Sequence, residues 1–274
     1  MSVRRLISLC AAAVLSVPAV ASAQDACANV AALAKSLPGT TIVSSKAVPA
    51  KAQDRLPAFC EVHATISPVA GSHVGAVYRL PMNWNGKVLG IGGGGGGFSG
   101  NLTLNAAANG LSRGYAVIQN DLGHESTGAL DPKFTIKAPG EPNVEAIIDF
   151  GHRATHVATD VGKRLVSSYY GRAPQHAYWQ GCSTGGRQGL AEIQRYPTDY
   201  DGVIAGAPVY TPLVYSNAIL RVQAFHKKPD SNLLPEHVPL IQKHARLRRA
   251  EEVPALLQQL PFLSADRQLH ARRE

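Results

Sequence analysis

Apolar and polar residues alternate along the first half of the chain in the manner of β-strands. The alternation runs through residues 61–66 and returns at 74–80 after a Gly-Ser turn, which predicts an antiparallel hairpin at the edge of a sheet. Short apolar runs further on predict four buried strands, at residues 87–91, 115–120, 176–180 and 202–206.

Helical spacing of apolar residues fills the intervals between these strands. The predicted helices cover residues 102–111, 144–170 and 186–196. Strands that alternate with helices predict a parallel α/β sheet with right-handed crossovers. After Pro208 the alternation stops, and only a short helical piece near 238–244 is predicted.

The first residues have the pattern of a secretory signal peptide. Arg4 and Arg5 precede an apolar run at 6–20, and small residues at 21–23 supply a cleavage site. The alternative is a membrane anchor, but the run is shorter than about 20 residues and contains a proline. We therefore predict that residues 1–23 are removed, that the protein is secreted or periplasmic, and that it does not associate with a membrane.

Composition narrows the class of protein. With 45% hydrophobic and 17% charged residues, the chain has enough apolar material for a globular core. The net charge is +8, from 27 Lys plus Arg against 19 Asp plus Glu. No run of five basic residues occurs, and aromatic residues are not interleaved with basic ones, so no nucleic-acid partner is predicted.

Three cysteines remain once the signal peptide is removed. These are Cys27, Cys60 and Cys182. The simplest allocation pairs Cys27 with Cys60 and leaves Cys182 unpaired, which ties the mature N-terminus to the segment before the first strands.

The segment Gly-Cys-Ser-Thr-Gly at 181–185 matches the nucleophile elbow G-x-S-x-G. It lies between a predicted strand and a predicted helix, where this motif presents a serine at the top of a sheet. Glycines flank Ser183 because a side chain at either position would collide with a neighbouring element. An ordinary Gly-Ser turn is the alternative, but the strand and helix around the motif favour Ser183 as a nucleophile.

A serine nucleophile also needs hydrogen-bond donors for the oxyanion. The backbone N–H of Thr184 supplies the first, and the six glycines at 92–97 supply the second. Gly95 and Gly96 are the named candidates, but the sequence does not decide which glycine of the run donates. The glycine run also fits G-x-G-x-x-G of a dinucleotide-binding oxidoreductase, with Asp121 as the acid. That acid lies further along the chain than the roughly 20 residues typical of the motif, and this interpretation leaves the serine elbow unexplained.

Two histidine positions have open interpretations. His152 and His156 are four residues apart on the long helix and could chelate a metal, but Arg153 stands where a zinc protease has its glutamate, so no metal site is predicted. His124 and Asp121 follow a strand end, where binding loops of α/β sheets lie. His124 is a candidate substrate contact, although loop polarity explains it equally well.

Longer segments resemble one family. The stretches G-C-S-T-G-G-R-Q-G-L at 181–190 and Q-R-Y-P-T-D-Y-D-G-V-I-A-G-A-P at 194–208 resemble the tannase and feruloyl esterase family, which includes hydrolases of small terephthalate esters. Segments 98–100, 120–124 and 170–174 add to the resemblance, which covers roughly residues 25–245. It implies a secreted α/β-hydrolase that cleaves esters of phenolic acids through Ser, Asp and His, with a lid domain that usually binds calcium.

The resemblance assigns roles by position. It makes Ser183 the acyl-accepting nucleophile, with Thr184 and a glycine of 92–97 as the oxyanion hole. Cys182 corresponds to a cysteine that the family joins to one following its catalytic histidine, and that partner is missing here.

The end of the chain departs from the family pattern. Where a cysteine-rich calcium region is expected, residues 246–249 read R-L-R-R. The expected fold is therefore an incomplete α/β-hydrolase over residues 24–245, without the lid domain and the last strands, followed by an atypical, frameshifted or disordered tail at 246–274. Candidates for a local triad follow no recognisable strand: Asp199, Asp201, Asp230, Asp266, His226, His237, His244 and His270.

The predicted function is hydrolysis of a small aromatic or phenolic ester through an acyl-serine intermediate, with the 274-residue chain itself inactive. No cofactor is predicted in this chain, and calcium is expected in the missing lid. The alternative from another class is a non-catalytic remnant that binds ligands weakly. Tannin, feruloyl and terephthalate esters are not distinguished, and the sequence carries no indication of the oligomeric state.

Overall fold

The protein is described here from a computed structural model. The structure describes residues 27–33, 36–94, 98–125 and 131–209, and isolated positions at 218, 220–224, 227, 239 and 243. Residues 1–210 form one compact unit and 211–274 a second. The expected signal peptide, most of the expected helical piece at 238–244 and the tail at 246–274 lie outside the described residues.

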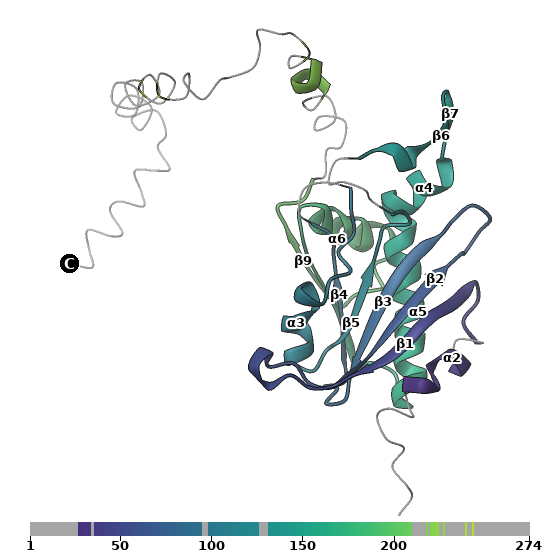
Figure 1. The fold of residues 1–274 in the computed structure, drawn as a ribbon, viewed down its shortest axis with the longest axis vertical. Coiled ribbons are helices and arrows are strands. Elements are labelled where there is room, and N and C mark those ends of the chain that lie inside the picture. Colours follow the sequence, from purple (N-terminus) through teal and green to yellow (C-terminus); the bar gives the residue numbers. More distant parts are fainter. Residues whose placement is uncertain are drawn as a thin grey trace, which may run out of the picture. The chain divides into compact units, whose positions relative to one another are not determined.

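The first unit is built around a seven-stranded sheet (Figure 1). Its strands lie in the spatial order β1-β2-β3-β5-β4-β8-β9. Their bounds are Thr40–Val48 for β1, Phe59–Ile66 for β2, Val74–Pro81 for β3, Lys87–Ile91 for β4, Ala116–Asn120 for β5, His176–Cys182 for β8 and Gly202–Gly206 for β9. The six strands expected from the sequence are therefore confirmed to within two residues at each end.

The sheet is mixed, and both the expected antiparallel hairpin and the expected parallel strands are confirmed. β5, β4, β8 and β9 run parallel, whereas β1, β2 and β3 pair antiparallel and β3 joins β5 antiparallel. The hairpin of β2 and β3 is not at the edge, because β1 covers it. The sequence Thr-Thr-Ile-Val-Ser-Ser at the start of β1 alternates weakly, and a register shift between Ile42 and Ser44 interrupts it, so periodicity alone did not reveal this strand.

Helices cover both faces of the sheet (Figure 1). On one face, Leu111 of α3 packs with Val117 of β5; on the other, Leu165 of α5 packs in a cluster with Ile118. Neighbouring residues of a strand point to opposite faces, so β5 lies at the centre of two cores. The helices and short elements are α2 (Val30–Leu33), η2 (Ala52–Asp54), α3 (Leu104–Ser112), η3 (Lys133–Thr135), β6 (Ile136–Ala138), β7 (Glu141–Pro142), α4 (Val144–Ile148), η4 (Asp149–Arg153), α5 (Ala154–Tyr170) and α6 (Thr184–Arg195).

The helix expected at 144–170 is interrupted by the π-helical turn η4. Arg187 of α6 donates to the carbonyl oxygens of Phe150 and Gly151 at 2.9 and 3.0 Å. Asp149, which is fully buried, accepts from Ser72 at 2.7 Å and from Arg153 at 2.5 Å. Ser72 and Arg187, which are distant in sequence, thus hold the turn in a conformation that the 3.6-residue periodicity does not predict.

A disulfide joins Cys27 to Cys60, as expected. It ties the segment before α2 to the second residue of β2, and both cysteines are buried. Cys182 is an exposed free thiol. Among the helices of the described residues, none has the length and apolar character needed to cross a bilayer.

Candidate active site at the serine turn

Ser183 lies in a strained turn between β8 and α6. β8 ends at Cys182 and α6 begins at Thr184, and Ser183 between them has φ 59° and ψ −114°. The N–H of Ser183 donates to Gly206 O of β9 at 3.0 Å, and its carbonyl accepts the N–H of Arg187 at 3.0 Å. A non-glycine residue adopts positive φ rarely and at a cost of about 1–3 kcal/mol. The surrounding hydrogen bonds hold Ser183 there, half-buried at the positive end of the α6 dipole.

The two flanking glycines are required by close backbone contacts. A Cβ on Gly181 would lie 2.4 Å from the carbonyl carbon and oxygen of Gly185, and a Cβ on Gly185 would lie 2.6 Å from Gly93 O. Neither position has room for a side chain, because the obstructing atoms are backbone. The turn therefore closes with α6 almost in contact with β8, as the motif predicts.

The glycine-rich segment, residues 92–97, packs directly on this turn through its described residues 92–94. The N–H of Gly185 donates to Gly93 O at 2.9 Å, and the N–H of Gly92 donates to Gln180 O at 2.9 Å. Gly94 lies beside the Cys182 carbonyl, with an added Cβ 3.4 Å from that oxygen. The structure thus places residues 92–94 of the glycine run against the serine turn, while Gly95 and Gly96, the predicted oxyanion donors, lie outside the described residues and their role stays a prediction.

A buried glutamine holds the near end of the glycine-rich segment. The Gly93 N–H donates to Gln188 Oε1 at 2.8 Å, and Gln188 Nε2 donates to Thr155 Oγ1 of α5 at 2.8 Å. Gln188 is 2% exposed. The Gln188 amide therefore fixes Gly93 relative to α5 and α6. Because the Gly93 N–H already donates to Gln188, it is not available to a ligand.

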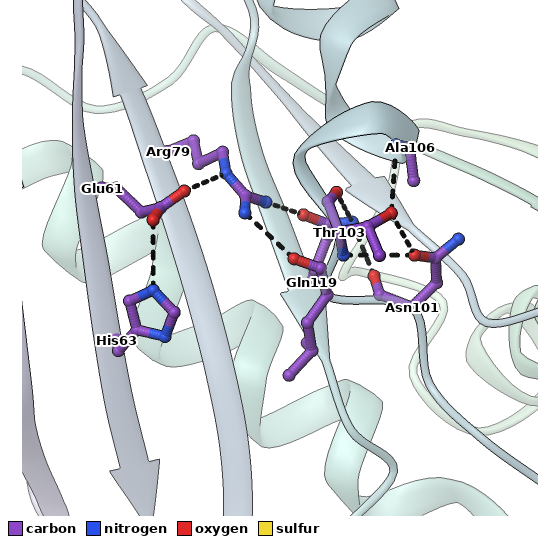
Figure 2. Close-up of polar contacts among 8 residues, drawn as sticks. Glu61, His63, Arg79, Asn101, Thr103, Ala106 and Gln119 are labelled. Carbon is purple, nitrogen blue, oxygen red and sulfur yellow. Dashed lines mark hydrogen bonds and ion pairs between the residues drawn. The ribbon is translucent and has the colours of Figure 1, made fainter. Parts of the chain in front are cut away.

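A buried arginine holds the chain that follows the glycine run, at residues 101–103 (Figure 2). Arg79 of β3 is 3% exposed. It donates to Glu61 Oε2 at 2.6 Å, to Leu102 O at 3.0 Å and to Gln119 Oε1. Burial lowers the pKa of Arg79 in spite of the Glu61 carboxylate, but a guanidinium keeps its charge at neutral pH.

Gln119 and Thr103 complete this network (Figure 2). Gln119 Nε2 donates to the carbonyl oxygens of Asn101 and Thr103 at 2.6 and 3.3 Å. Thr103 Oγ1 donates to Asn101 Oδ1 at 2.7 Å and accepts from the Ala106 N–H at 3.3 Å, which caps α3. The chain that leaves the glycine run is thus fixed to β2, β3 and β5.

His124 lies in an aromatic cluster next to this segment. Its ring stacks on Phe134 with centroids 3.7 Å apart, and Phe98 and Phe150 contact the same group edge-on. Burial lowers the pKa of His124, so the ring is neutral at pH 7. His124 is 9% exposed and its Nε2 has no hydrogen-bond partner among the described residues. Its assignment as a substrate contact stays a prediction.

The nearby acids that follow Ser183 in sequence lie at the other end of the sheet. Asp201 accepts the N–H of Ala177, near the start of β8, at 2.7 Å, and Asp199 accepts from His156 of α5 at 2.7 Å. Ser183 follows the opposite end of β8, about 20 Å away at 3.3 Å per residue. Asp201 therefore cannot act as the acid of a catalytic triad with Ser183. The remaining local candidates, Asp230, Asp266, His226, His237, His244 and His270, are outside the described residues.

The two histidines of the predicted long helix have different partners. His152 Nδ1 lies 2.7 Å from Tyr196 Oη, whereas His156 Nδ1 faces Asp199. Asp121, beyond the end of β5, accepts the Gly123 N–H at 2.7 Å. The sequence did not reveal Gln188 or Arg79 as parts of the site, because a single buried amide or guanidinium carries no local pattern.

Comparison with known proteins places these features in a family. The family model described as tannase and feruloyl esterase matches residues 60–249. An uncharacterized esterase of Xanthomonas campestris pv. campestris is 40% identical over 197 residues, which are 69% of this chain and 32% of that protein. Feruloyl esterase B of Aspergillus niger is 39% identical over 150 residues, 54% of this chain and 27% of that protein.

Solved structures show the same fold. The crystal structure of feruloyl esterase B from Aspergillus oryzae superposes with a TM-score of 0.58 at 31% identity, covering 68% of this chain and 37% of that one. Tannin acyl hydrolase from Aspergillus niger gives a TM-score of 0.57 at 25% identity, covering 72% and 40%. The mixed sheet with helices on both faces is thus the α/β-hydrolase fold. The chain spans about a third or less of the length of the curated relatives it matches.

Proposed function

Because the chain belongs to the tannase and feruloyl esterase family, we propose that it carries the nucleophile and oxyanion hole of a serine esterase. The substrates are carboxylic esters of aromatic or phenolic acids. The observation that carries this proposal is the strained Ser183 at the strand-to-helix turn, with the glycine-rich segment packed against it.

The reaction is acyl transfer through Ser183. Its Oγ attacks the ester carbonyl carbon, the C=O electrons move to oxygen, and the alcohol leaves when the tetrahedral intermediate collapses. Water then attacks the acyl-serine and releases the acid. The Ser183 proton goes to a general base, which passes it on to the oxygen of the departing alcohol. Asp199 and Asp201 take no part in this transfer, because both are engaged elsewhere.

The developing oxyanion is held by backbone N–H groups. Thr184 supplies one, and the segment at 94–96 supplies the other. Gly92 and Gly93 are excluded as donors, since their N–H groups already bond to Gln180 and Gln188. Each oxyanion donor is worth about 2.7–4 kcal/mol of barrier.

The aromatic cluster supports an aromatic acyl group. Phe98 directly follows the glycine run, and Arg187, one helical turn beyond Ser183, lies over the Phe150 ring at 4.1 Å. Burial lowers the pKa of Arg187 to about 10, which leaves it charged. This arrangement places ring surfaces, including His124, beside the segment that contacts the serine turn, and we propose that they flank the substrate ring.

The proposal includes export from the cytoplasm. The pattern of residues 1–23 supports it, and so does the Cys27–Cys60 disulfide, because disulfides persist mainly in oxidising compartments. The calcium that the family resemblance implies belongs to a lid domain outside the described residues, so no step of the mechanism uses it.

The test measures hydrolysis of methyl ferulate and methyl gallate by the longest protein that contains this chain, with Ser183→Ala as the comparison. We expect turnover in the parent protein and a loss approaching the roughly million-fold effect of removing the nucleophile of a serine protease. Mass spectrometry after exposure to a fluorophosphonate should place the adduct on Ser183.

Turnover that survives Ser183→Ala, or an adduct elsewhere, would contradict the assignment. Absence of both turnover and adduct in a folded protein would favour the alternative of a non-catalytic, ligand-binding protein. Circular dichroism of parent and variant separates loss of chemistry from loss of fold.

A further inference from the structure

The C-terminal end of α6 contains a second group of chemically active side chains. His156 of α5, Glu192 of α6 and Asp199, between α6 and β9, each place one nitrogen or oxygen within 4.8 Å of the others. Glu192 is eight residues beyond Thr184, about 12 Å along the helix at 1.5 Å per residue. This group, here called the α6 C-terminal cluster, is therefore separate from the serine turn.

Glu192 is the unusual member of the cluster. It is 1% exposed, and as a charged carboxylate it has no hydrogen-bond donor among the described residues; only a protonated carboxyl can share a hydrogen bond with Asp199. A buried carboxylate without a partner is costly, and buried charges in proteins are normally paired or bound to metal ions. Burial, together with Asp199, raises the pKa of Glu192 to about 9. The position thus needs either a proton or a cation.

His156 and Asp199 form the open side of the cluster. Asp199 Oδ2 lies 2.7 Å from His156 Nδ1, and the His156 ring stacks on Tyr196 with centroids 3.8 Å apart. The His156 side chain is 34% exposed, which gives an ion and its waters access from solvent. Lys163 is a competing cation, but its ammonium donates to the backbone carbonyl of Asp199 rather than to a carboxylate.

We propose that His156, Glu192 and Asp199 bind a divalent transition-metal ion of the zinc class, with water completing the coordination. One imidazole and two carboxylates are a donor set that Zn²⁺ accepts, with bonds of about 2.0–2.2 Å. Two carboxylates and a neutral imidazole supply a charge of −2 that matches the ion. Binding replaces the hydrogen bond between His156 and Asp199 and requires side-chain shifts of about an ångström.

The ion would be structural rather than catalytic. It would join α5, α6 and the segment before β9, three elements that are distant in sequence, at a point well removed from Ser183. The single nitrogen and small number of donors distinguish it from a calcium site, which takes six to eight oxygens.

The test uses the purified protein, freed of affinity tags and stripped with a chelator, and Zn²⁺ alone as the probe. Isothermal titration calorimetry should give one Zn²⁺ per chain, and thermal unfolding should shift to higher temperature when Zn²⁺ is added. Glu192→Gln keeps the shape of the side chain and should weaken Zn²⁺ binding at least tenfold. Asp160→Asn removes an exposed carboxylate of α5 that pairs with Arg164 and should leave Zn²⁺ binding unchanged.

A second variant keeps the test decisive if Glu192→Gln fails to fold. His156→Ala alters a partly exposed side chain, and it should also weaken Zn²⁺ binding at least tenfold and abolish the visible absorption of the Co²⁺-substituted protein. Failure of the parent to bind Zn²⁺, or unchanged binding in a folded variant of either residue, would overturn the proposal. None of these readouts depends on esterase activity.

Discussion

The two ends of α6 are built in opposite ways. At the N-terminal end, the serine turn is held by backbone contacts: Gly181, Gly185 and Gly93 approach one another so closely that none of them has room for a side chain. The side chains of Gln188 and Trp179 add hydrogen bonds to Gly93 and Gly185. At the C-terminal end, the α6 C-terminal cluster consists of polar side chains from three elements. A contact between backbones is geometrically stiff, whereas a contact between side chains can rearrange around a proton or an ion. The first kind suits a nucleophile and the second suits a binding site.

Gln188 connects the two ends. It lies one turn before Glu192 on the α6 face that packs on α5, and its amide reaches back to the glycine-rich segment through Gly93. The same face of one helix therefore supports the oxyanion segment with a satisfied polar group and carries, four residues later, a carboxylate left without a hydrogen-bond donor among the described residues.

The largest expected effect, after removal of Ser183 itself, comes from adding one methyl group to the N-terminal end. Gly181→Ala forces a Cβ to within 2.4 Å of backbone atoms of Gly185. We expect a loss of about 3 kcal/mol in the free energy of unfolding and about a hundredfold loss of esterase activity, since an ångström of displacement at the nucleophile can cost that much. Urea unfolding and methyl ferulate hydrolysis measure the two effects.

Gly151→Ala is the matched control for that substitution, because an added Cβ there meets nothing within 4 Å. Its stability and activity should remain close to those of the parent. If Gly181→Ala behaves like Gly151→Ala, the serine turn is not held by backbone contact, and the contrast between the two ends of α6 fails.

The next effect tests the link between the two ends. Gln188→Leu leaves the Gly93 N–H and the Thr155 hydroxyl without their buried partner, at a cost of about 1–3 kcal/mol in the free energy of unfolding. If Gln188 positions the oxyanion segment, kcat for methyl ferulate should fall about tenfold with little change in KM. Gln194→Leu, at an exposed position of the same helix, is the control and should change neither constant. A rise in KM alone would show that Gln188 acts on substrate binding instead.

The smallest effect concerns stability alone and comes from Asp121, a half-buried carboxyl at the same edge of the sheet as Ser183. Burial, with a smaller contribution from the nearby Asp149 carboxylate, raises the pKa of Asp121 to about 7, although Asp121 accepts an N–H from Gly123. Aspartate in an unfolded chain titrates near pH 4, so between about pH 4 and 7 the folded state binds more protons than the unfolded state. The contribution of Asp121 to stability is therefore complete below about pH 4 and is lost as the pH rises to about 7.

Asp121→Asn should remove that dependence. Between pH 5 and pH 8 the free energy of unfolding of the parent should fall by about 2–3 kcal/mol more than that of the variant, as measured by urea titration at both pH values. Asp160→Asn, at an exposed position, should keep the parental slope. A parental slope in Asp121→Asn as well would mean that the carboxylate is solvated in the folded protein.

The sequence by itself was sufficient for the parts of the molecule whose contacts are local. Strand and helix positions followed from periodicity. The serine turn followed from five consecutive residues, because Gly181 and Gly185 meet within one turn of chain. The pairing of Cys27 with Cys60 followed from the small number of cysteines that remain after the expected removal of the signal peptide. The weakly alternating edge strand β1 and the antiparallel pairing of β3 with β5 did not follow, since the choice of partner strand depends on contacts between distant segments.

Only the tertiary structure decided how distant polar residues are matched. Arg79 meets Gln119 and Leu102, Gln188 meets Gly93, and Glu192 is placed beside His156 and Asp199. Each of these contacts joins residues on different elements, and the cost of burying a polar group depends on what the fold places beside it. In the sequence, a glutamate that will be buried cannot be distinguished from any other polar residue of a helix. Packing alone determines that it needs a proton or a cation.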